Sequence, residues 1–291
     1  MKKTFLSKWA LGLILSVTVI ACVDHEPGPD KLRVKTLTRI LPDAPNVSIV
    51  STLTYDPQGR IASMFTNQVP ENPGGPTETS TYLYGGDGKL SQMDRTLSGG
   101  GSERYVYTND GWGKVTKIKY TGAPDNFYDF ILNYDVTGSL LLSTKRSFGI
   151  SGVQYDQVNA LTFGMDNVSS VMSTTTLVRN TTNTSMVTTD FGYDDHTNPF
   201  YGVFLIPAPV KIATPSSGSF NHYTYYGGVD NLLHLSKNNP TSANVKGASQ
   251  TLYNYTYNAE GLPTKRETWV KITLELPAVL QETLLYGYET Y

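Results

Sequence analysis

Apolar and polar side chains alternate along much of the chain after residue 38. An aromatic or apolar residue stands at every second position of several short segments, as in Leu53/Tyr55, Tyr82/Tyr84, Tyr105/Tyr107, Tyr128/Phe130/Leu132/Tyr134, Leu161/Phe163, Phe191/Tyr193 and Tyr253/Tyr255/Tyr257. The opposite positions carry Thr52, Thr54, Arg104, Asn133, Asp190, Asn254 and Thr256. A period of two predicts β-strands with one covered face and one face in water.

A short phrase ends most of these segments. It reads aromatic, then Asp, Asn or Gly, two variable residues, Gly, a basic residue and an aliphatic residue; the clearest copies are 55–61 and 84–90. The anchoring aromatics fall at positions 55, 84, 107, 134, 163, 193, 226 and 257, so the period is 23 to 33 residues. Asp or Asn followed by Gly is typical of a tight turn, so each copy predicts a β-hairpin.

Aliphatic residues recur three positions apart after these turns. Ile61 and Met64 form one such pair, and Leu90 and Met93 form another. Three is the wrong period for a regular strand. Either a one-residue bulge follows each turn or the sheet is covered on both sides, and we favour the bulge because it would recur with the repeat.

These patterns together predict an all-β fold. Tyr occurs 20 times, which favours pleated, half-buried surfaces. We expect a long antiparallel meander of repeated hairpins, twisted and curled into an open barrel-like or two-layer sheet, because long sheets rarely stay flat. A transmembrane barrel is not favoured, since its strands would need a lipid-facing apolar band.

The longer connections are expected to gather at the end of the sheet opposite the repeat turns. They are 67–80, 98–103, 121–126, 147–156, 180–185, 213–219 and 237–248. Long loops on a rigid scaffold often carry binding residues, although loops also lengthen where nothing restrains them.

The N-terminus has the parts of a secretory signal peptide. Lys2 and Lys3 precede an apolar run from Trp9 to Ile20, and Ala21 stands before Cys22, the only cysteine. The sequence around Cys22 resembles the lipobox of bacterial lipoproteins, which implies cleavage before Cys22 and a lipid on that residue. The alternative is a membrane helix with a stray thiol, but the run falls short of about 20 apolar residues.

The resemblance sets the expected organisation and location. We assign 1–21 to the signal peptide, 22–38 to the lipidated cysteine and a flexible tether, and 39–291 to a single β-hairpin-repeat domain. It implies an outer-membrane lipoprotein in the cell envelope, facing the periplasm or the surface. Acidic residues after Cys22 resemble the export tags of surface lipoproteins in Bacteroidota-type bacteria.

The phrase at 55–61 resembles the YD repeat of Rhs-type proteins, whose hairpins stack into long β shells. The chain is also similar to Bacteroidota-type lipoproteins of unknown function that carry a few YD-like hairpins. These resemblances imply an architecture and an envelope address, and they imply no activity.

Charge argues against a nucleic-acid partner. Removing residues 1–21 takes away three lysines and no acid, which leaves 20 basic residues against 25 acidic ones, a net charge of about −5. A mildly acidic chain with scattered basic residues lacks the footprint of a nucleic-acid binder. Contact with the membrane is therefore expected through the lipid.

Catalytic motifs are scarce. Asp194, Asp195 and His196 could ligate a cation or form an acid–base pair, but a solvated turn is the more common use of such residues. The histidines lack metal-ligand spacing, and no Gly-x-Ser-x-Gly elbow occurs. We therefore predict no catalytic residues, no metal and no cofactor.

Aromatic residues are the remaining candidates for binding. Trp112 in a turn, and Tyr223, Tyr225 and Tyr226 before a Gly-Gly pair, could stack on a sugar or line an apolar pocket; the alternative is that most tyrosines pack the covered face. We expect a non-catalytic binding or structural module for a glycan, a hydrophobic ligand or an envelope protein. The alternative function is a carboxylate-dependent hydrolase at the cell surface.

Overall fold

The computed structural model describes residues 31–73, 75, 77–122, 127–150, 153–178, 181–202 and 232–291. The chain divides into two compact units, one of Met1–Leu32 with Thr290–Tyr291 and one of Arg33–Glu289. In the first unit, the amide of Tyr291 donates a hydrogen bond to the carbonyl of Lys31 (3.0 Å). The second unit contains the barrel.

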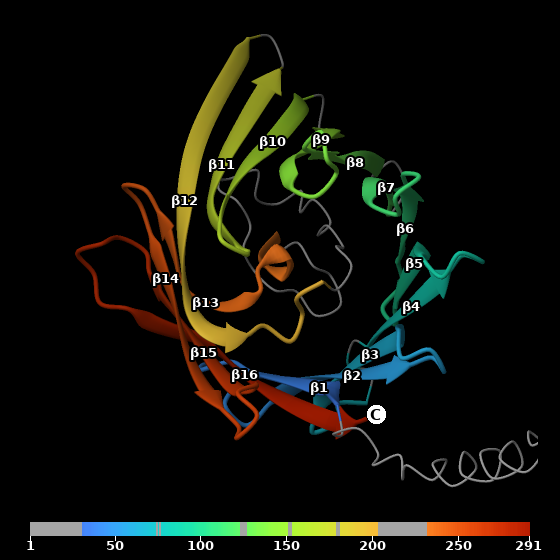
Figure 1. Cartoon of the computed structure of the whole chain (residues 1–291). Helices are drawn as coiled ribbons and strands as arrows, with labels where there is room; N and C mark the ends of the chain where they lie inside the picture. Colours follow the sequence, from blue (N-terminus) through green and yellow to red (C-terminus); the bar gives the residue numbers. More distant parts are fainter. Residues whose placement is uncertain are drawn as a thin grey trace, which may run out of the picture. The chain divides into compact units, whose positions relative to one another are not determined.

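Sixteen strands and one 3₁₀ turn make up the described elements (Figure 1). They are β1 (Leu32–Ile40), β2 (Ser48–Tyr55), β3 (Ile61–Val69), β4 (Glu78–Tyr84), β5 (Leu90–Leu97), β6 (Ser102–Asn109), β7 (Val115–Thr121), β8 (Phe127–Tyr134), β9 (Leu141–Ile150), β10 (Val153–Gly164), β11 (Asn167–Val178), β12 (Thr182–Thr197), η1 (Leu232–Leu235), β13 (Asn238–Val245), β14 (Gln250–Tyr257), β15 (Pro263–Lys271) and β16 (Val279–Thr290).

The strands follow one another in chain order around a closed barrel, and β16 lies beside β1. This confirms the predicted all-β antiparallel meander, and it shows that the sheet closes on itself into one layer. Twist and stagger accumulate from hairpin to hairpin, so a meander of this length can bring its first and last strands together. An ion pair between Arg39 and Glu282 (2.9 Å) joins the two strands at this seam.

The repeat turns carry the predicted bulge. Tyr55 pairs with Ile61 while Thr54 pairs with Ser63, which leaves Ala62 as the extra residue. The same shift follows five further turns, those before Leu90, Val115, Leu141, Val168 and Pro263. The bulge explains the three-residue spacing of the aliphatics, and the prediction is confirmed.

The turn at Asp56 shows why the repeat needs its polar residues. The Asp56 carboxylate accepts hydrogen bonds from the backbone amides of Gln58 (3.0 Å) and Arg60 (2.9 Å), and Gly59 takes a positive φ of 78°. Arg60 pairs with Asp56 and also lies 4.0 Å from the ring centroid of Tyr84, in the next hairpin. The basic residue after the glycine therefore ties one repeat to the next.

The repeat tyrosines make a second tie that the sequence analysis did not anticipate. Five tyrosine hydroxyls reach back to a backbone carbonyl of an earlier strand or hairpin: Tyr84 to Ile61 (2.8 Å), Tyr134 to Val115 (3.1 Å), Tyr193 to Val168 (2.7 Å), Tyr288 to Pro263 (2.8 Å) and Tyr55 to Val34. We call these bonds the tyrosine ties. They give the hydroxyl a structural role where tyrosine ends a strand, as in β2, β4 and β8.

The buried face of the strands points into the ring. Figure 1 shows η1 inside the circle of strands, and Leu235 of η1 packs against the buried cluster. The buried positions include Leu53, Tyr82, Tyr105, Tyr107, Tyr128, Phe130, Leu132, Leu161 and Tyr253, as the alternation predicted. Thr54, Arg104, Asn133, Asn254 and Thr256 are exposed on the opposite face.

Some boundaries differ from those expected. Strand β1 begins at Leu32, so residues 32–38 belong to it rather than to the tether; Val34 and Leu37 are buried in the core. Strand β13 occupies part of the expected connection 237–248. Its Pro240 stands beside a register shift opposite Tyr193, and a bulge is a place where a strand tolerates proline.

The repeat turns gather at one end of the barrel, as predicted, but the longer connections do not all lie at the other, because residues 198–237 join β12 to β13 at the repeat-turn end. Because neighbouring strands are antiparallel, all the repeat turns share one rim, and connections such as 41–47, 98–101 and 272–278 share the other. Within 147–156, β9 and β10 extend up to residues 150 and 153, so this stretch is a long hairpin and no loop. Residues 213–219 lie outside the described residues.

Candidate functional site

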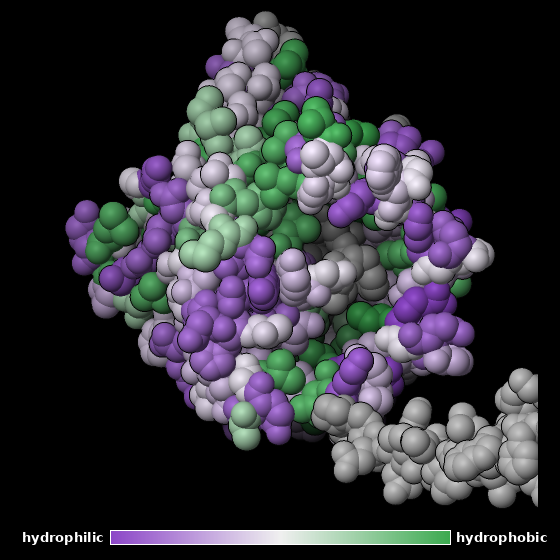
Figure 2. Space-filling model, in the orientation of Figure 1, coloured by the Kyte–Doolittle hydropathy of each residue, from purple (hydrophilic) through white to green (hydrophobic). Residues whose placement is uncertain are grey.

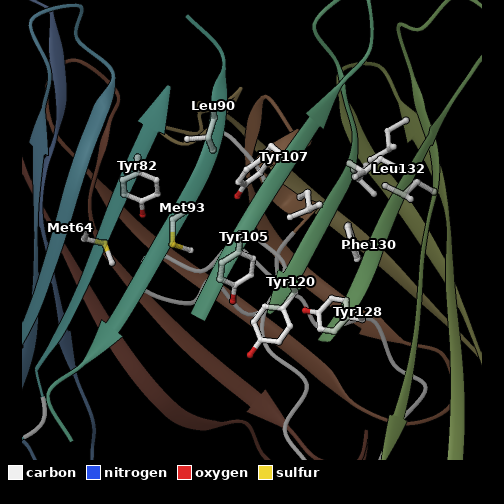
Figure 3. Packing of buried hydrophobic residues seen from close by; sticks show 14 of the residues in the cluster. Met64, Tyr82, Leu90, Met93, Tyr105, Tyr107, Tyr120, Tyr128, Phe130 and Leu132 are labelled. Atoms are coloured by element: carbon white, nitrogen blue, oxygen red, sulfur yellow. The ribbon is translucent and has the colours of Figure 1, made fainter. Parts of the chain in front are cut away.

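Five aromatic rings form a continuous row on the inner wall, one from each of strands β6 to β10. Neighbouring ring centroids are 5.1 Å apart for Tyr105 and Tyr120, 4.7 Å for Tyr120 and Tyr128, 6.4 Å for Tyr128 and Phe148, and 5.1 Å for Phe148 and Tyr155. We call this row the aromatic ladder; Figure 3 shows its first three rings beside one another. Strand register produces it, since Tyr105 pairs with Tyr120 and Tyr120 with Tyr128.

The ladder is packed as core. Tyr105 and Tyr120 are each 1% exposed, and burial raises the pKa of both phenols far above the ordinary value. Stacked and tilted pairs of this kind add about 0.5–1.5 kcal/mol each beyond the burial of their area. The expectation that most tyrosines pack the covered face is confirmed for this wall.

A buried ion-pair cluster stands at one end of the ladder. The Arg95 guanidinium lies 2.6 Å from a carboxylate oxygen of Glu78 and 3.0 Å from one of Glu103, and Tyr105 donates a hydrogen bond to Glu103 (3.2 Å). These are two of the inward-facing carboxylates that a hydrolase could use, and Glu282 is a third. Glu78 and Glu103 are both held by the same arginine, which favours a charge-compensated structural role.

A second cluster lies on the wall that includes the seam. Glu282 accepts from Arg266 (2.7 Å) and from Arg39 (2.9 Å), and Arg266 stands 5.5 Å from the ring centroid of Tyr253. Sequence reasoning missed both clusters. The available signal was an arginine at an inward position of the alternation, as Arg95 is two residues after Met93.

The Asp194–His196 segment lies in strand β12, where the register with β13 shifts. Tyr257 donates a hydrogen bond to Asp194, and the other Asp194 oxygen accepts from the backbone amides of His196 (3.0 Å) and Asn239 (3.2 Å). The His196 ring stacks on Tyr257 with centroids 3.8 Å apart. Asp194 thus accepts backbone amides within a strand, and the solvated turn predicted for this segment is not what forms.

Asp195 and His196 are brought together, but at the surface. The Asp195 carboxylate lies 3.0 Å from His196 Nδ1, and its side chain is 95% exposed. Across the described ranges, His, Cys, Asp and Glu do not gather in groups of three or more that could hold a metal ion. The pair therefore has the setting of a solvated contact.

Trp112 is the one predicted binding residue within the described chain. It is 86% exposed at the tip of the turn between β6 and β7, where its backbone amide donates to Asp110 (2.9 Å). The side chain of Lys89 lies against the neighbouring Gly113. Cys22, Tyr223, Tyr225 and Tyr226 lie outside the described residues.

Comparison with known proteins supports the fold alone. No protein-family model matches the chain, and no curated protein matches it. The barrel is porin-like in fold. A porin-like protein from Bacteroides uniformis superposes with a TM-score of 0.53 at 14% identity, covering 88% of this chain and 96% of that one. A porin-like protein from Bacteroides vulgatus gives a TM-score of 0.37 at 14% identity, with 89% and 99% covered.

The outer face of the barrel carries charged pairs beside exposed apolar side chains such as Leu83 and Val106. Arg104 and Asp94 form an ion pair across β5 and β6 (2.7 Å), and Lys117 and Asp129 pair across β7 and β8 (3.5 Å). Figure 2 shows hydrophilic residues around the outside of the ring and hydrophobic ones toward its inner side. In the described part of the chain, no helix is long and apolar enough to cross a membrane.

Proposed function

We propose that this chain is a cell-envelope lipoprotein, anchored to the outer membrane through Cys22, whose barrel stands in water as a non-catalytic binding module. The observation that carries the proposal is the burial of aromatic rings on the inner face together with charged pairs on the outer face. A spanning barrel presents an apolar band about 25 Å tall to lipid and encloses a polar lumen. Here charged pairs face outward and aromatic rings face inward.

Burial of the inner-face residues directs the proposed binding role to the rims. The aromatic ladder and the two arginine clusters are buried, whereas Trp112 presents its indole to solvent on the rim of repeat turns. An exposed indole can stack on a sugar ring. A glycan that stacks on Trp112, beside the Lys89 ammonium, is therefore the ligand class that the described residues fit.

Export without lipidation tests the proposal. Residues 22–291 carrying Cys22→Ser are placed behind a signal peptide that is cleaved without lipid attachment, and the native chain is expressed in parallel. The variant should be recovered in the soluble periplasmic fraction. The native chain should incorporate labelled palmitate and sediment with membranes.

Two results would contradict the proposal. A variant that stays in membranes after carbonate extraction would show that the barrel spans the bilayer. A native chain that incorporates no labelled palmitate would show that Cys22 carries no lipid. The soluble variant and its Trp112→Ala counterpart are then compared on a glycan array, where equal signals would exclude Trp112 as the contact.

A further inference from the structure

Strand β12 extends beyond the strand that follows it. Its residues Thr182–Thr188 pair with β11, from Thr182 opposite Val178 to Thr188 opposite Met172. Pairing with β13 begins only at Thr189, opposite Val245. The amide of Lys246 donates to the Thr188 carbonyl (3.0 Å), and there the β13–β14 turn ends the ladder.

The far edge of this segment is open. In the part of the chain that the structure describes, no strand pairs with residues 182–187 on the side away from β11. Figure 1 shows β12 standing beyond β13 and β14. Residues 182–186 are exposed one after another, with Met186 62% exposed, so neither face of the strand is covered there.

An open edge has a definite binding chemistry. Every second residue presents its backbone N–H and C=O outward, which is a template for another strand. Natural edges are usually blocked by a lysine, a proline or a bulge. The sequence Thr-Asn-Thr-Ser-Met-Val-Thr at 182–188 has no charge and no proline, and its register with β11 has no shift.

We propose that this edge, Thr182–Thr188, binds the same edge of a second copy of the chain, antiparallel and with Ser185 on the two-fold axis. That axis sets Thr184 opposite Met186 of the other copy, and the uncharged segment brings no like charges together. A second copy supplies an open strand of matching length, and a two-fold interface closes after two subunits. The inference goes beyond the proposed function and does not depend on it.

Disulfide trapping tests the pairing directly. Ser185→Cys is introduced into the full chain, which is extracted in detergent and oxidised. Opposed Cα atoms of antiparallel strands are about 4.5–5.5 Å apart, within the reach of a disulfide, so a covalent dimer is expected. The matched control is Thr176→Cys in β11. Thr176 already pairs with Asp156 on one side and Thr184 on the other, so this variant should stay monomeric. The parent with Cys22 alone gives the background.

A non-covalent measurement complements the trap. Ser185→Lys places two ammonium groups against each other at the axis, so the dimer should dissociate at least tenfold more readily in sedimentation equilibrium, while Ser185→Thr should leave it unchanged. The proposal is overturned if the parent is monomeric up to ~100 µM. It is equally overturned if Ser185→Cys yields no more covalent dimer than Thr176→Cys, or if Ser185→Lys leaves the dimer intact.

Discussion

The wall of strands β2–β9 and the wall around β12 and β13 satisfy their backbone hydrogen-bonding groups in different ways. In the first, the short turns combine an Asp cap, a bulge and a tyrosine tie, as at Asp56 and Tyr84. At the β6–β7 turn Asn109 takes the place of the tyrosine and donates to the Leu90 carbonyl (3.5 Å). In the second, a longer connection between β12 and β13 replaces the short turn, and the register shifts twice, around Tyr193.

Buried polar side chains compensate for the missing turn in the second wall. Asn198 donates to the Ser236 carbonyl (3.2 Å) and accepts from the Phe200 amide (3.0 Å), and Ser236 Oγ accepts from the Val168 amide (3.0 Å). Backbone groups inside a protein must find partners. The comparison teaches that the repeat satisfies them locally, whereas the irregular wall uses side chains from distant positions.

The largest effect is expected in the regular wall. Tyr120→Ala removes the ring that contacts both Tyr105 and Tyr128 in the ladder and should lower the free energy of unfolding by about 3–5 kcal/mol. Chemical denaturation followed by far-UV circular dichroism measures it. Trp112→Ala, at an exposed tip, should stay within about 0.5 kcal/mol. Equal losses for the two variants would show that the ladder is not part of the core.

The irregular wall should carry a pH dependence. Burial, aided by the nearby charge of Arg266, lowers the pKa of His234 from 6.5 to about 3. Below pH 6.5 the unfolded chain binds a proton there that the folded chain refuses, so stability falls as the pH drops from 6.5 toward 3.

Replacing His234 isolates that contribution. Relative to its own value at pH 7, the parent should lose about 2–3 kcal/mol more than His234→Gln at pH 4.5, because each pKa unit is worth about 1.4 kcal/mol. Urea melts at the two pH values measure the difference. His196→Gln, at a more exposed ring, is the control, and parallel pH profiles for parent and His234→Gln would refute the assignment.

The smallest effects come from the tyrosine ties. Tyr84→Phe removes one bond to the half-buried Ile61 and should cost about 1 kcal/mol. Tyr193→Phe removes a bond to the fully buried Val168 and a contact with Ser236 (3.0 Å), so about 1–3 kcal/mol is expected. Thermal melts should show a larger loss of stability for Tyr193→Phe than for Tyr84→Phe. A larger loss for Tyr84→Phe would contradict the proposed contrast between the two walls.

Local chemistry made the regular wall predictable. The alternation at Tyr82 and Tyr84 predicted the covered face. Asp56 with Gly59 predicted the turn, and the spacing of Ile61 and Met64 predicted the bulge. Each of these signals lies within a few residues. Closure of the sheet depends on stagger summed over all the strands, which no single window of sequence contains.

Long-range contacts account for what was missed. Strand β13 reads as a loop because its Asn, Pro and Ser residues are poor strand formers, yet it pairs with both β12 and β14. From the sequence alone Arg95 is expected at the surface. Its burial depends on Glu78 and Glu103, which pair with it from the two neighbouring strands. Trp112 was predictable because its exposure depends only on its place in a turn.

The seam between β1 and β16 has a consequence for how the chain folds. Other strand pairs join neighbours in sequence, but the contact between Arg39 and Glu282 spans 243 residues. Hairpins can therefore form progressively from local contacts, while closing the ring must gather the whole chain, which makes it the slow, high-contact-order event. A circular permutant that links Tyr291 to Lys31 and opens a repeat turn would move this late step to another pair of strands while keeping the same barrel.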